Sequence, residues 1–386
     1  MRDFWLEAPV NKLVDENHGD PFDKVKQKHT TLPPGLSFGN YPVNDPVSMD
    51  ALISFINDNY VAEKDVSLKY TKETIHWALC TPNAIKSLWV SIVDDISREL
   101  VAFIAGSVIP SQVTTTEGTT ENDKKPVEIE TGVVVVDFMC VNKAYRNRDL
   151  SFALISEITR RATALGHIHA YFTLSKRYTT PLCSFGVYHR LLNVKSLLTT
   201  GFTKVPKGKQ MRKYVAEHAV PNKPAMTLVK LQDTKDALLQ ESTIVKLVPL
   251  LRKALMSRRI KLIYDDETLH HIIKNATHTY YAVNTNNEPS HISILYDTAL
   301  EIKCKPLSIA NLHFHTHDRL GDMLTSLAYY LAPQGYQLLN ATEQFGRTTK
   351  TLEASKFIAG TGKLNAYFWN LQMEKCSPHD IPFFSI

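Results

Sequence analysis

One stretch of this sequence constrains the fold more than any other: an apolar run of strand length that leads directly into a basic loop and a helix. The run extends from Gly132 to Val141 and consists mostly of Val, Phe, Met and Cys. Such a run is typical of a strand that is buried on both faces. A helix is predicted over 150–165, because apolar residues recur at positions 154, 155, 158, 162 and 165 and Gly166 can end it.

The loop between this strand and this helix, residues 142–148, predicts an anion site. Unpaired N–H groups and the positive end of the dipole at a helix N-terminus hold phosphates, and Arg146 and Arg148 would add charge-assisted hydrogen bonds. The alternative is that both arginines are solvated surface charges. With a strand expected from Ala170, the order of elements resembles a CoA-binding N-acyltransferase of the GNAT type. Other α/β proteins also place phosphates at a strand-to-helix turn.

The rest of the pattern predicts two α/β halves with one site between them. Irregular structure is expected over 1–45 and an exposed loop over 111–126. The first half is predicted to contain helices at 49–57 and 72–79 and strands at 88–92 and 100–109. The second half is predicted to contain helices at 244–257 and 320–331, strands at 261–264, 280–283, 291–296 and 307–315, and a last strand at 364–371 after the glycine-rich segment 359–362.

Charge and cysteine usage exclude several classes of protein. Lys and Arg total 44 against 39 for Asp and Glu, and the resulting charge of +5 suits an anionic ligand better than nucleic acid. The five cysteines are far apart, which favours a reducing compartment over a disulfide framework or a zinc site. The alternating His313, His315 and His317 suit a strand with a solvated face as well as a metal site, but no carboxylate completes a ligand set. Neither a signal peptide nor a membrane span is expected.

Several motifs resemble those of the N-myristoyltransferase family. The segment Asp137-Phe-Met-Cys-Val-Asn-Lys143, followed by Arg146 and by Ile155-Ser-Glu-Ile-Thr-Arg-Arg161, is similar to the family pattern N-F-L-C-V-H-K and R-S-K-R-L-A-P-V-L-I-K-E-I-T-R-R. Further similar motifs follow in the family's order along essentially the whole chain: Phe4-Trp-Leu-Glu-Ala-Pro-Val10, Leu32-Pro-Pro-Gly35, Asn59-Tyr-Val61, Trp77-Ala-Leu79, Tyr188-His-Arg-Leu-Leu-Asn193, and Gly360-Thr-Gly-Lys-Leu364 with Tyr367 and Asn370.

The resemblance implies an α/β (α+β) fold of two fused GNAT-like acyl-CoA N-acyltransferase lobes, related by a pseudo-twofold axis, with mixed sheets flanked by helices. It divides the chain into an N-terminal arm (1–45), a lobe that binds acyl-CoA (46–205) and a lobe that binds peptide and supplies the C-terminal carboxylate (206–386). The implied activity is transfer of a myristoyl group from myristoyl-CoA to the N-terminal glycine amine of proteins. Myristoyl-CoA is then a substrate, and neither a permanent cofactor nor a metal is expected.

The resemblance also implies catalytic roles. The backbone N–H groups of Phe138 and Met139 would bind the oxyanion where their strand leaves its neighbour. The carboxylate of Ile386 would accept the amine proton, and four apolar residues among the last six favour a buried end over a frayed one. Thr173 and Asp137 would hold the amine, although a Thr on a buried strand is as often a packing residue.

Two further sets of residues follow from the resemblance. Those implied for myristoyl-CoA are Phe4, Trp5, Cys140, Val141, Arg146, Asn147, Arg148, Leu150, Ser151, Phe152 and Ala153. Those implied for the peptide are Tyr60, Glu63, Phe172, His189, Tyr296, Gly360 and Leu364. Alternatives stay open, since Phe4 and Trp5 could simply anchor the arm and His189 could be a structural hydrogen-bonder.

Departures from the family pattern concentrate in the residues that face the two substrates. Asp137 stands where the family has Asn, and Asp149 replaces a basic residue of the cradle, although an acid at a helix start is also a good cap. Phe152 replaces Pro, Phe172 replaces Tyr and Thr361 replaces Asp. The acidic run after Val61 is shortened, which weakens the attraction for basic peptides.

Three hypotheses remain. The first is a divergent N-myristoyltransferase that acts on N-terminal glycine peptides as a cytoplasmic monomer, without a nucleic-acid partner or an integral membrane segment. The second is a non-catalytic homologue that binds acyl-CoA or N-terminal peptides. The third is an N-acyltransferase with a different acyl or amine specificity.

Overall fold

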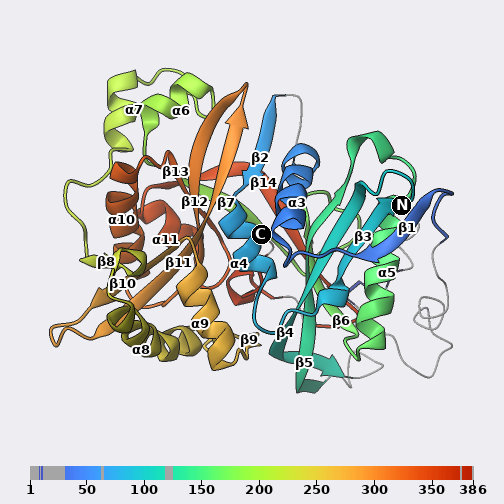
Figure 1. Cartoon of the computed structure of the whole chain (residues 1–386). Helices are drawn as coiled ribbons and strands as arrows, with labels where there is room; N and C mark the ends of the chain where they lie inside the picture. The colour runs from blue at the N-terminus through green and yellow to red at the C-terminus, as the bar shows by residue number, and fades with distance from the viewer. Residues whose placement is uncertain are drawn as a thin grey trace.

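The computed structural model of the chain describes residues 8, 10–11, 31–61, 65–117, 125–373 and 376–384. In these residues fourteen strands form one sheet, and twelve of them follow the order β1-β3-β4-β5-β6-β14-β7-β13-β12-β11-β10-β8 (Figure 1). β2 pairs with β11, and β9 pairs with β4. The sheet is mixed, because β5–β6 and β12–β13 are parallel pairs whereas neighbours such as β4–β5 and β11–β12 are antiparallel.

The elements have the following bounds. The strands are β1 (Leu36–Asn40), β2 (Val66–Tyr70), β3 (Trp89–Asp94), β4 (Leu100–Glu117), β5 (Lys125–Val141), β6 (His169–Leu174), β7 (Cys183–Leu191), β8 (Leu228–Lys230), β9 (Lys261–Leu262), β10 (His278–Val283), β11 (Pro289–Ile302), β12 (Lys305–His315), β13 (Leu338–Thr342) and β14 (Phe357–Trp369). The helices are α3 (Pro46–Asn59), α4 (Lys72–Leu79), α5 (Leu150–Ala164), α6 (Val194–Thr200), α7 (Met211–Glu217), α8 (Ala237–Leu255), α9 (Asp266–Asn275), α10 (Leu320–Leu331) and α11 (Thr349–Ala354). Short 3-10 turns lie at Lys86–Leu88, Lys143–Tyr145, Leu231–Asp233, Ala332–Gln334 and Pro378–Asp380.

The two halves of the chain repeat one arrangement. Each half contains a long hairpin, β4–β5 or β11–β12, whose second strand is followed by a helix and then by a parallel partner strand. The last strand, β14, pairs with β6 on one side and with β7 on the other, so it joins the halves into a continuous sheet. This arrangement places the end of the chain beside the parallel pair of the first half.

Helices cover both faces of the sheet. In the first half, α5 packs on one face, while α3 and α4 share a second core with Phe103 and Phe138 on the other. In the second half, α10 packs on the face opposite to α8 and α9. One core extends across both halves, since Val135 and Tyr171 from the first half belong to the same cluster as Leu247 of α8.

Side-chain caps fix where several helices begin. Asp45 accepts a hydrogen bond from the backbone N–H of Ser48 at 2.8 Å, and Pro46 occupies the first turn of α3. Asp265 caps α9 in the same way by accepting from Thr268 N–H at 2.7 Å. These sequence signals, an acid or Thr directly before an apolar period, explain why most of the expected helices lie close to the observed ones.

The structure corrects the expectation of a loop over 111–126. β4 continues to Glu117 and β5 begins at Lys125, with register pairs from Ser111–Thr131 to Glu117–Lys125. One face of this ribbon is buried at Ser111, Val113 and Thr115, and only Val113 among them is apolar. Thr-rich segments suit the pleated backbone of a strand. Polarity alone therefore does not distinguish this ribbon from a loop.

Two smaller expectations are also wrong. The first forty-five residues are not irregular throughout, because β1 adds to the edge of β3 through backbone pairing that needs no apolar period. The glycine-rich segment 359–362 does not precede the last strand but lies inside β14, where the register shifts between Ala359 and Lys363. A Cβ on Gly360 would lie 2.5 Å from His189 Nε2, so a bulge with close approach explains the glycine.

The histidines on β12 do not form a solvated face. His313 and His315 are buried, and burial lowers the pKa of His313 to about 3 and that of His317 to about 4. The rings contact aromatic neighbours. The ring centroid of Trp77 lies 5.0 Å from that of His313, and the ring centroid of Phe345 lies 5.3 Å from that of His315. Within the described part of the chain, no group of three His, Cys, Asp or Glu residues is arranged to hold a metal ion.

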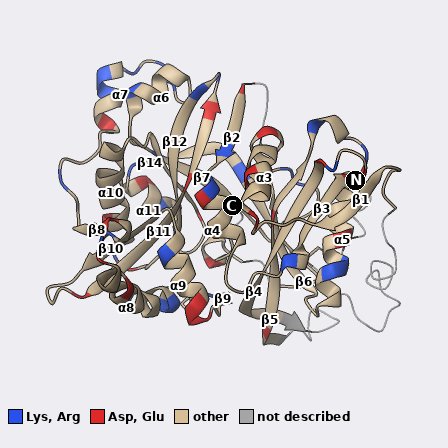
Figure 2. Cartoon of the chain, viewed as in Figure 1, with Lys and Arg blue, Asp and Glu red and all other residues tan. Residues whose placement is uncertain are grey.

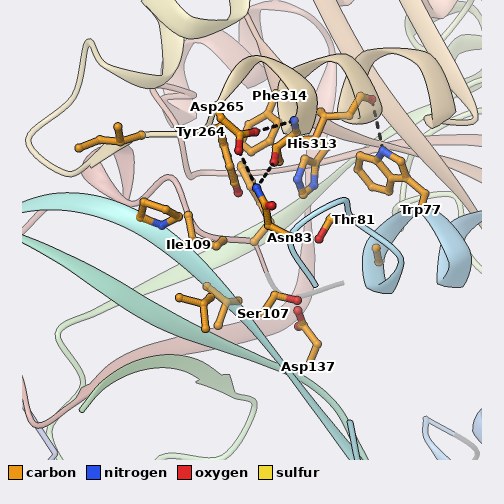
Figure 3. Close-up of a pocket in the computed structure, with 18 of the residues that line it drawn as sticks. Trp77, Thr81, Asn83, Ser107, Ile109, Asp137, Tyr264, Asp265, His313 and Phe314 are labelled. Carbon is orange, nitrogen blue, oxygen red and sulfur yellow. Dashed lines mark hydrogen bonds between the residues drawn. The ribbon is translucent and has the colours of Figure 1, made fainter. Parts of the chain in front are cut away.

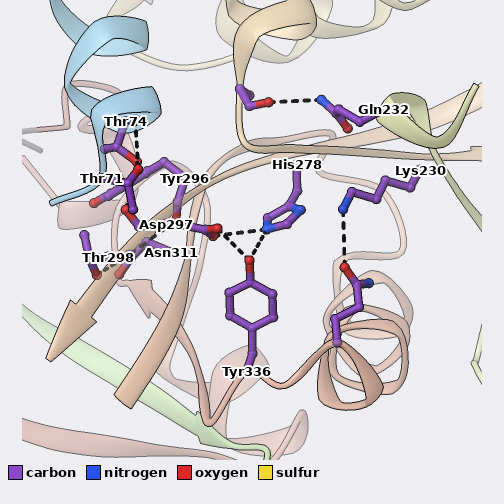
Figure 4. Close-up of polar contacts among 12 residues, drawn as sticks. Thr71, Thr74, Lys230, Gln232, His278, Tyr296, Asp297, Thr298, Asn311 and Tyr336 are labelled. Carbon is purple, nitrogen blue, oxygen red and sulfur yellow. Dashed lines mark hydrogen bonds and ion pairs between the residues drawn. The ribbon is translucent and has the colours of Figure 1, made fainter. Parts of the chain in front are cut away.

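The second half also contains a polar cluster of histidine, aspartate and tyrosine. His278 Nε2 is 3.1 Å from Asp297 Oδ1 and 2.6 Å from the hydroxyl of Tyr336, which donates to Asp297 Oδ2 at 2.5 Å (Figure 4). Desolvation, followed by the hydrogen bond to Asp297, raises the pKa of Tyr336. The cluster joins β10, β11 and the turn before β13.

Charged segments are dispersed over the fold. In the view of Figure 2, Lys and Arg segments alternate with Asp and Glu segments over both halves. No helix among the described residues combines the length and apolar composition needed to cross a membrane.

Candidate functional site

The site is built around a break in the pairing of β5. β5 and β6 pair only from Val133–His169 to Val135–Tyr171, and the strands separate beyond that point. On its other side, β5 pairs Asp137 with Ala105 and Cys140 with Phe103, which leaves Phe138 and Met139 opposite Ile104 alone. This is a β-bulge, and Phe138 has a φ of +53°. The bulge removes regular ladder partners from the backbone at Phe138 and Met139, as an oxyanion site requires.

A cavity of about 400 Å³ opens where β5 and β6 separate, and we call it the splay cavity. Its lining is mainly apolar and includes Ile155, Ile158 and Thr159 of α5. Seven residues predicted for the site line it together: Tyr60, Asp137, Phe138, Met139, Phe172, Thr173 and Leu364. The structure therefore brings the predicted oxyanion donors and the predicted amine ligand Thr173 to one enclosed space.

A second cavity of about 520 Å³, the cradle cavity, lies at the start of α5. Its lining includes these predicted residues: Tyr60, Met139, Cys140, Val141, Arg146, Asn147, Leu150 and Ser151. Tyr60 and Met139 line both this cavity and the splay cavity, so the two adjoin. The predicted Arg148, Phe152 and Ala153 do not line it; Ala153 is buried in the core under α5.

The backbone of the cradle explains its capacity for an anion. Asn147 and Asp149 have φ values of +64° and +56°, and no side chain caps the first turn of α5 in the described structure. The N–H groups of that turn thus keep their capacity to bind a phosphate. The expectation that Asp149 caps the helix is wrong, because its side chain accepts no hydrogen bond from the first turn of α5.

The two arginines of the cradle already have contacts. Arg146 donates to the backbone oxygen of Asn59 at 2.5 Å and to that of Val141 at 3.4 Å. The guanidinium carbon of Arg148 lies 5.0 Å from the centre of the Tyr145 ring. Arg146 thus ties α3 to the end of β5 and holds a positive charge at the cradle wall.

A third cavity of about 390 Å³ lies between the halves, and we call it the junction cavity (Figure 3). Its walls come from α4, β4 and β5 of the first half and from α9 and β12 of the second. Asp137 and Ser107 lie on one side of it, whereas Asn83 and Asp265, joined by a 2.6 Å hydrogen bond, lie on the other. Asp137 lines both this cavity and the splay cavity and is therefore the point where they meet.

Four tyrosines surround Asp137: Tyr60, Tyr70, Tyr171 and Tyr296. Burial is the main cause that raises the pKa of each hydroxyl, and the negative charge of Asp137 contributes to all four. The tyrosines come from four separate elements or loops, so the half-buried Asp137 lies in an aromatic part of the protein. Apolar surroundings of this kind strengthen any interaction between charges.

The described end of the chain packs against the same region. Phe383 is fully buried, and its backbone oxygen accepts from Gln344 at 2.6 Å. The ring of Phe383 lies 5.0 Å from that of Tyr171, and the ring of Phe384 lies 4.6 Å from that of His313. Phe384 also lines the junction cavity. The predicted base Ile386 lies outside the described residues, as do Phe4, Trp5 and Glu63.

Three residues predicted for the peptide do not line these cavities. His189 Nδ1 is 2.7 Å from Asn340 Oδ1, and His189 packs against Gly360 where β7 pairs with β14. Tyr296 stacks on Trp77 at 6.0 Å, behind the wall of the junction cavity. His189 and Gly360 thus form a structural contact of their own.

Sequence patterns do not point to the junction cavity. Asp265 carries a recognisable signal, an acid before a helix, but that signal predicts a cap and not a cavity wall. No recognisable sequence signal marks Asn83, Ser107 or Phe384 as a cavity residue. Only the sheet order brings these segments together, since residues of α4 and α9 lie close in space but almost 200 positions apart.

Comparisons with known proteins agree on one family. The model of the N-terminal domain of myristoyl-CoA:protein N-myristoyltransferase matches residues 16–185. A glycylpeptide N-tetradecanoyltransferase of Plasmodium falciparum is 24% identical over 397 residues, covering 98% of this chain and 92% of the relative. One from Candida albicans is 25% identical and covers 95% of this chain and 84% of the relative. One from Mycosarcoma maydis is 26% identical over 246 residues, which are 60% of this chain but 33% of that relative.

Solved structures give the same result for the fold. A structure of Saccharomyces cerevisiae N-myristoyltransferase with bound myristoyl-CoA has a TM-score of 0.81 at 22% identity, covering 98% of this chain and 91% of its own. A second such structure has a TM-score of 0.80 at 23% identity. This likeness confirms the predicted mixed α/β fold with helices on its faces.

Proposed function

This chain belongs to the N-myristoyltransferase family, and we propose that it transfers a myristoyl group from myristoyl-CoA to the N-terminal glycine amine of proteins. The observation that carries the proposal is that the splay cavity, which contains Phe138 and Met139, adjoins the cradle cavity at Tyr60 and Met139 and the junction cavity at Asp137. An acyl transferase needs a cradle for its donor, a donor pair for the oxyanion and a separate entrance for the amine. The cradle, splay and junction cavities supply spaces for these three tasks.

We assign the acyl donor to the first half. The CoA phosphates bind at the start of α5, near Arg146, Asn147 and Ser151, and the thioester enters the splay cavity. The thioester oxygen then lies at the backbone N–H groups of Phe138 and Met139. Residues 46–205 are the proposed acyl-CoA lobe and residues 206–386 the proposed peptide lobe.

The chemical step is addition of the glycine nitrogen to the thioester carbon. The C–N bond forms as the carbonyl oxygen takes negative charge, and collapse of that intermediate breaks the C–S bond to release CoA as the thiol. Thr173 lines the splay cavity opposite β5 and is the proposed hydrogen-bond partner of the amine. The carboxylate of Ile386 stays a prediction for a proton acceptor.

We also propose a cellular compartment and an oligomeric state for the protein. All five cysteines are free thiols, including Cys183 and Cys376, which share a hydrogen bond; free thiols support a reducing compartment, and we propose the cytoplasm. We propose a monomer because the cavities are formed within one chain. Sedimentation velocity at several protein concentrations tests the monomer directly.

A second candidate function is binding without efficient transfer. Asp149 supports it, because its carboxylate lines the cradle cavity and opposes a pyrophosphate. The two functions differ in turnover and not in binding.

The experiment measures transfer of a fourteen-carbon acyl group from its CoA thioester to short peptides, together with direct binding of the thioester. Peptides that begin with Gly are compared with the same peptides after N-acetylation, and basic residues are varied downstream. Turnover with free Gly alone supports the transferase. Tight binding of the thioester with no turnover on any peptide supports the binding module, and a preference for shorter acyl groups supports a different acyl specificity.

A further inference from the structure

Asp137 lies at the boundary between the splay cavity and the junction cavity. It lines the splay cavity together with Phe138, Met139 and Thr173, and it lines the junction cavity together with Ser107. Figure 3 shows the Asp137 side chain on the same side of the junction cavity as Ser107, with its carboxylate directed at the cavity. The acyl donor and the amine, if they enter by different cavities, therefore meet at this carboxylate.

The chain itself fixes the carboxylate close to the reacting atoms. Asp137 directly precedes Phe138, and consecutive Cα atoms are about 3.8 Å apart. A carbonyl oxygen held by the N–H groups of Phe138 and Met139 thus places its carbon within a few ångströms of Asp137. A nitrogen that attacks this carbon has to approach through the same space.

We propose that Asp137 binds the ammonium of the incoming glycine and accepts its first proton. The inference rests on the proposed transferase function and deepens it, because it names the group that produces the nucleophile. One N–H bond of the ammonium breaks, its proton moves to a carboxylate oxygen, and the electron pair stays on nitrogen. The neutral amine then adds to the thioester carbon. After addition, the second proton passes from the nitrogen to the departing sulfur as the C–S bond breaks, so CoA leaves as the thiol, and Asp137 then releases the first proton to water.

The surroundings favour this transfer. An ammonium beside a carboxylate is a pair of charges, whereas an amine beside a carboxylic acid is neutral. A half-buried setting close to four buried tyrosines therefore favours the neutral pair more than bulk water does. Proton transfer also removes the negative charge of Asp137 before negative charge develops on the thioester oxygen. An aspartate that stayed ionised beside the oxyanion donors would oppose the transition state.

Among the described residues, none of the titratable groups that share a cavity with Asp137 or respond to its charge changes protonation near pH 7. These groups are Tyr60 after α3, Tyr70 of β2, Tyr171 of β6, Tyr296 of β11, His313 of β12 and, across the junction cavity, Asp265 before α9; Cys140 of β5 interacts with Tyr60, and Arg347 interacts with Tyr296. Burial raises the pKa of the tyrosines and of Cys140 and lowers that of His313, so these groups stay neutral near pH 7. Hydrogen bonds from Thr268 lower the pKa of Asp265, which stays ionised.

The test compares Asp137→Asn with the unmodified chain in single-turnover transfer to a Gly peptide. The amide keeps the size of the side chain and can still accept a hydrogen bond, but it takes no proton. We expect the transfer rate to fall by about 10²-fold or more, with binding of myristoyl-CoA unchanged within about twofold. The lost rate should return in part as the pH rises past the amine pKa near 8, because solution then supplies neutral amine.

A second nucleophile separates proton transfer from structure. A peptide with aminooxyacetyl in place of glycine presents an amine that is already neutral at pH 7. We expect the penalty of Asp137→Asn to shrink at least tenfold with this peptide. A positioning role alone would leave the penalty the same for both nucleophiles, and that result would overturn the proposal.

A control variant accounts for damage to the fold. Tyr336→Phe removes a half-buried hydrogen bond to Asp297 (Figure 4), and neither residue lines any of the three cavities, so it lowers stability and leaves the cavity linings in place. Asp137→Asn that transfers at the unmodified rate, with the same pH profile, would also overturn the inference. Failure of the transferase function itself is distinct, since the unmodified chain would then transfer nothing to any glycine peptide.

Discussion

The guanidinium carbon of Arg347 lies 4.9 Å from the centre of the Phe384 ring. Arg347 is fully buried, and it donates to the backbone oxygens of Thr342 and His313 at 2.7 and 3.0 Å. Desolvation lowers the pKa of Arg347 to about 9, so the guanidinium stays charged near pH 7. The contact holds Phe384 against β12, which places the described end of the chain at the wall of the junction cavity.

Removal of residues 384–386 is therefore expected to abolish acyl transfer but to leave acyl-CoA binding intact. The described residues that line the splay and cradle cavities include none beyond Trp369, so the donor site is left complete. The measurement pairs single-turnover transfer with calorimetric binding of myristoyl-CoA. Ile386→Ala is the matched control, because it keeps the chain length and the terminal carboxylate.

Unchanged transfer after this deletion would remove Ile386 from the mechanism. It would not affect the role of Asp137, whose position does not depend on the chain end. A loss of donor binding instead would mean that the segment supports the first half, contrary to the separate linings described above.

Gly360 is expected to tolerate no side chain. An added Cβ would lie 2.5 Å from His189 Nε2 and 2.8 Å from the backbone oxygen of Val187. Gly360→Ala should cost about 1–3 kcal/mol of unfolding free energy, which denaturant titration measures. Gly362→Ala is the control, since its Cβ meets nothing within 4 Å, and it should change stability by less than about 0.5 kcal/mol. Equal effects of the two variants would contradict the close approach at Gly360.

The elements that the sequence predicted well are those with a clear period. Leu320–Leu331 is a helix with the expected bounds, because its apolar stripe and flanking residues agree. The ribbon formed by β4 and β5 was missed because its buried positions include Ser111 and Thr115, so alternate burial produces almost no hydrophobic pattern. Backbone pairing, unlike side-chain burial, leaves a weak signal in the sequence.

The candidate site was likewise predicted only in part. Phe138 and Met139 were assigned to the oxyanion site through their resemblance to a family motif, whereas the local order of strand, loop and helix predicted only an anion site at residues 142–148. The junction cavity could not be foreseen, because β14 must first join the two halves before Asp265 can face Asp137. Long-range pairing sets that geometry, and no short motif encodes it.

Buried histidines on β12 predict a loss of stability in mild acid. Burial lowers the pKa of His313 to about 3, below its unfolded value near 6.5. A group with a lowered folded pKa stabilises the protein above the unfolded pKa, and this contribution is lost as the pH falls toward the folded pKa. Between pH 6.5 and 4.5 we expect a loss of about 1–3 kcal/mol from His313.

The variant His313→Phe tests this pH dependence. The Nδ1 atom of His313 has no hydrogen-bond partner in the described structure, so an apolar ring of similar size fits the site. Denaturant titrations across pH 4.5–7 should show a shallower slope for the variant than for the unmodified chain. Identical slopes would mean that His313 takes up no proton on unfolding in this range.

The charge of Asp149 predicts that donor binding can be improved. Asp149 lines the cradle cavity with Arg146, its side chain makes no cap hydrogen bond to α5, and its φ is +56°. Asn adopts this backbone conformation readily, so Asp149→Asn removes a like charge from the phosphate site without strain. We expect CoA to bind about two- to fivefold more tightly at low salt, by the free energy of one charge near a helix start. The gain should shrink at high salt, because the cradle is open to solvent. Asp95→Asn, at an exposed turn of the same half, should leave CoA affinity unchanged. Weaker binding by Asp149→Asn would show that the carboxylate supports the cradle instead of opposing its ligand.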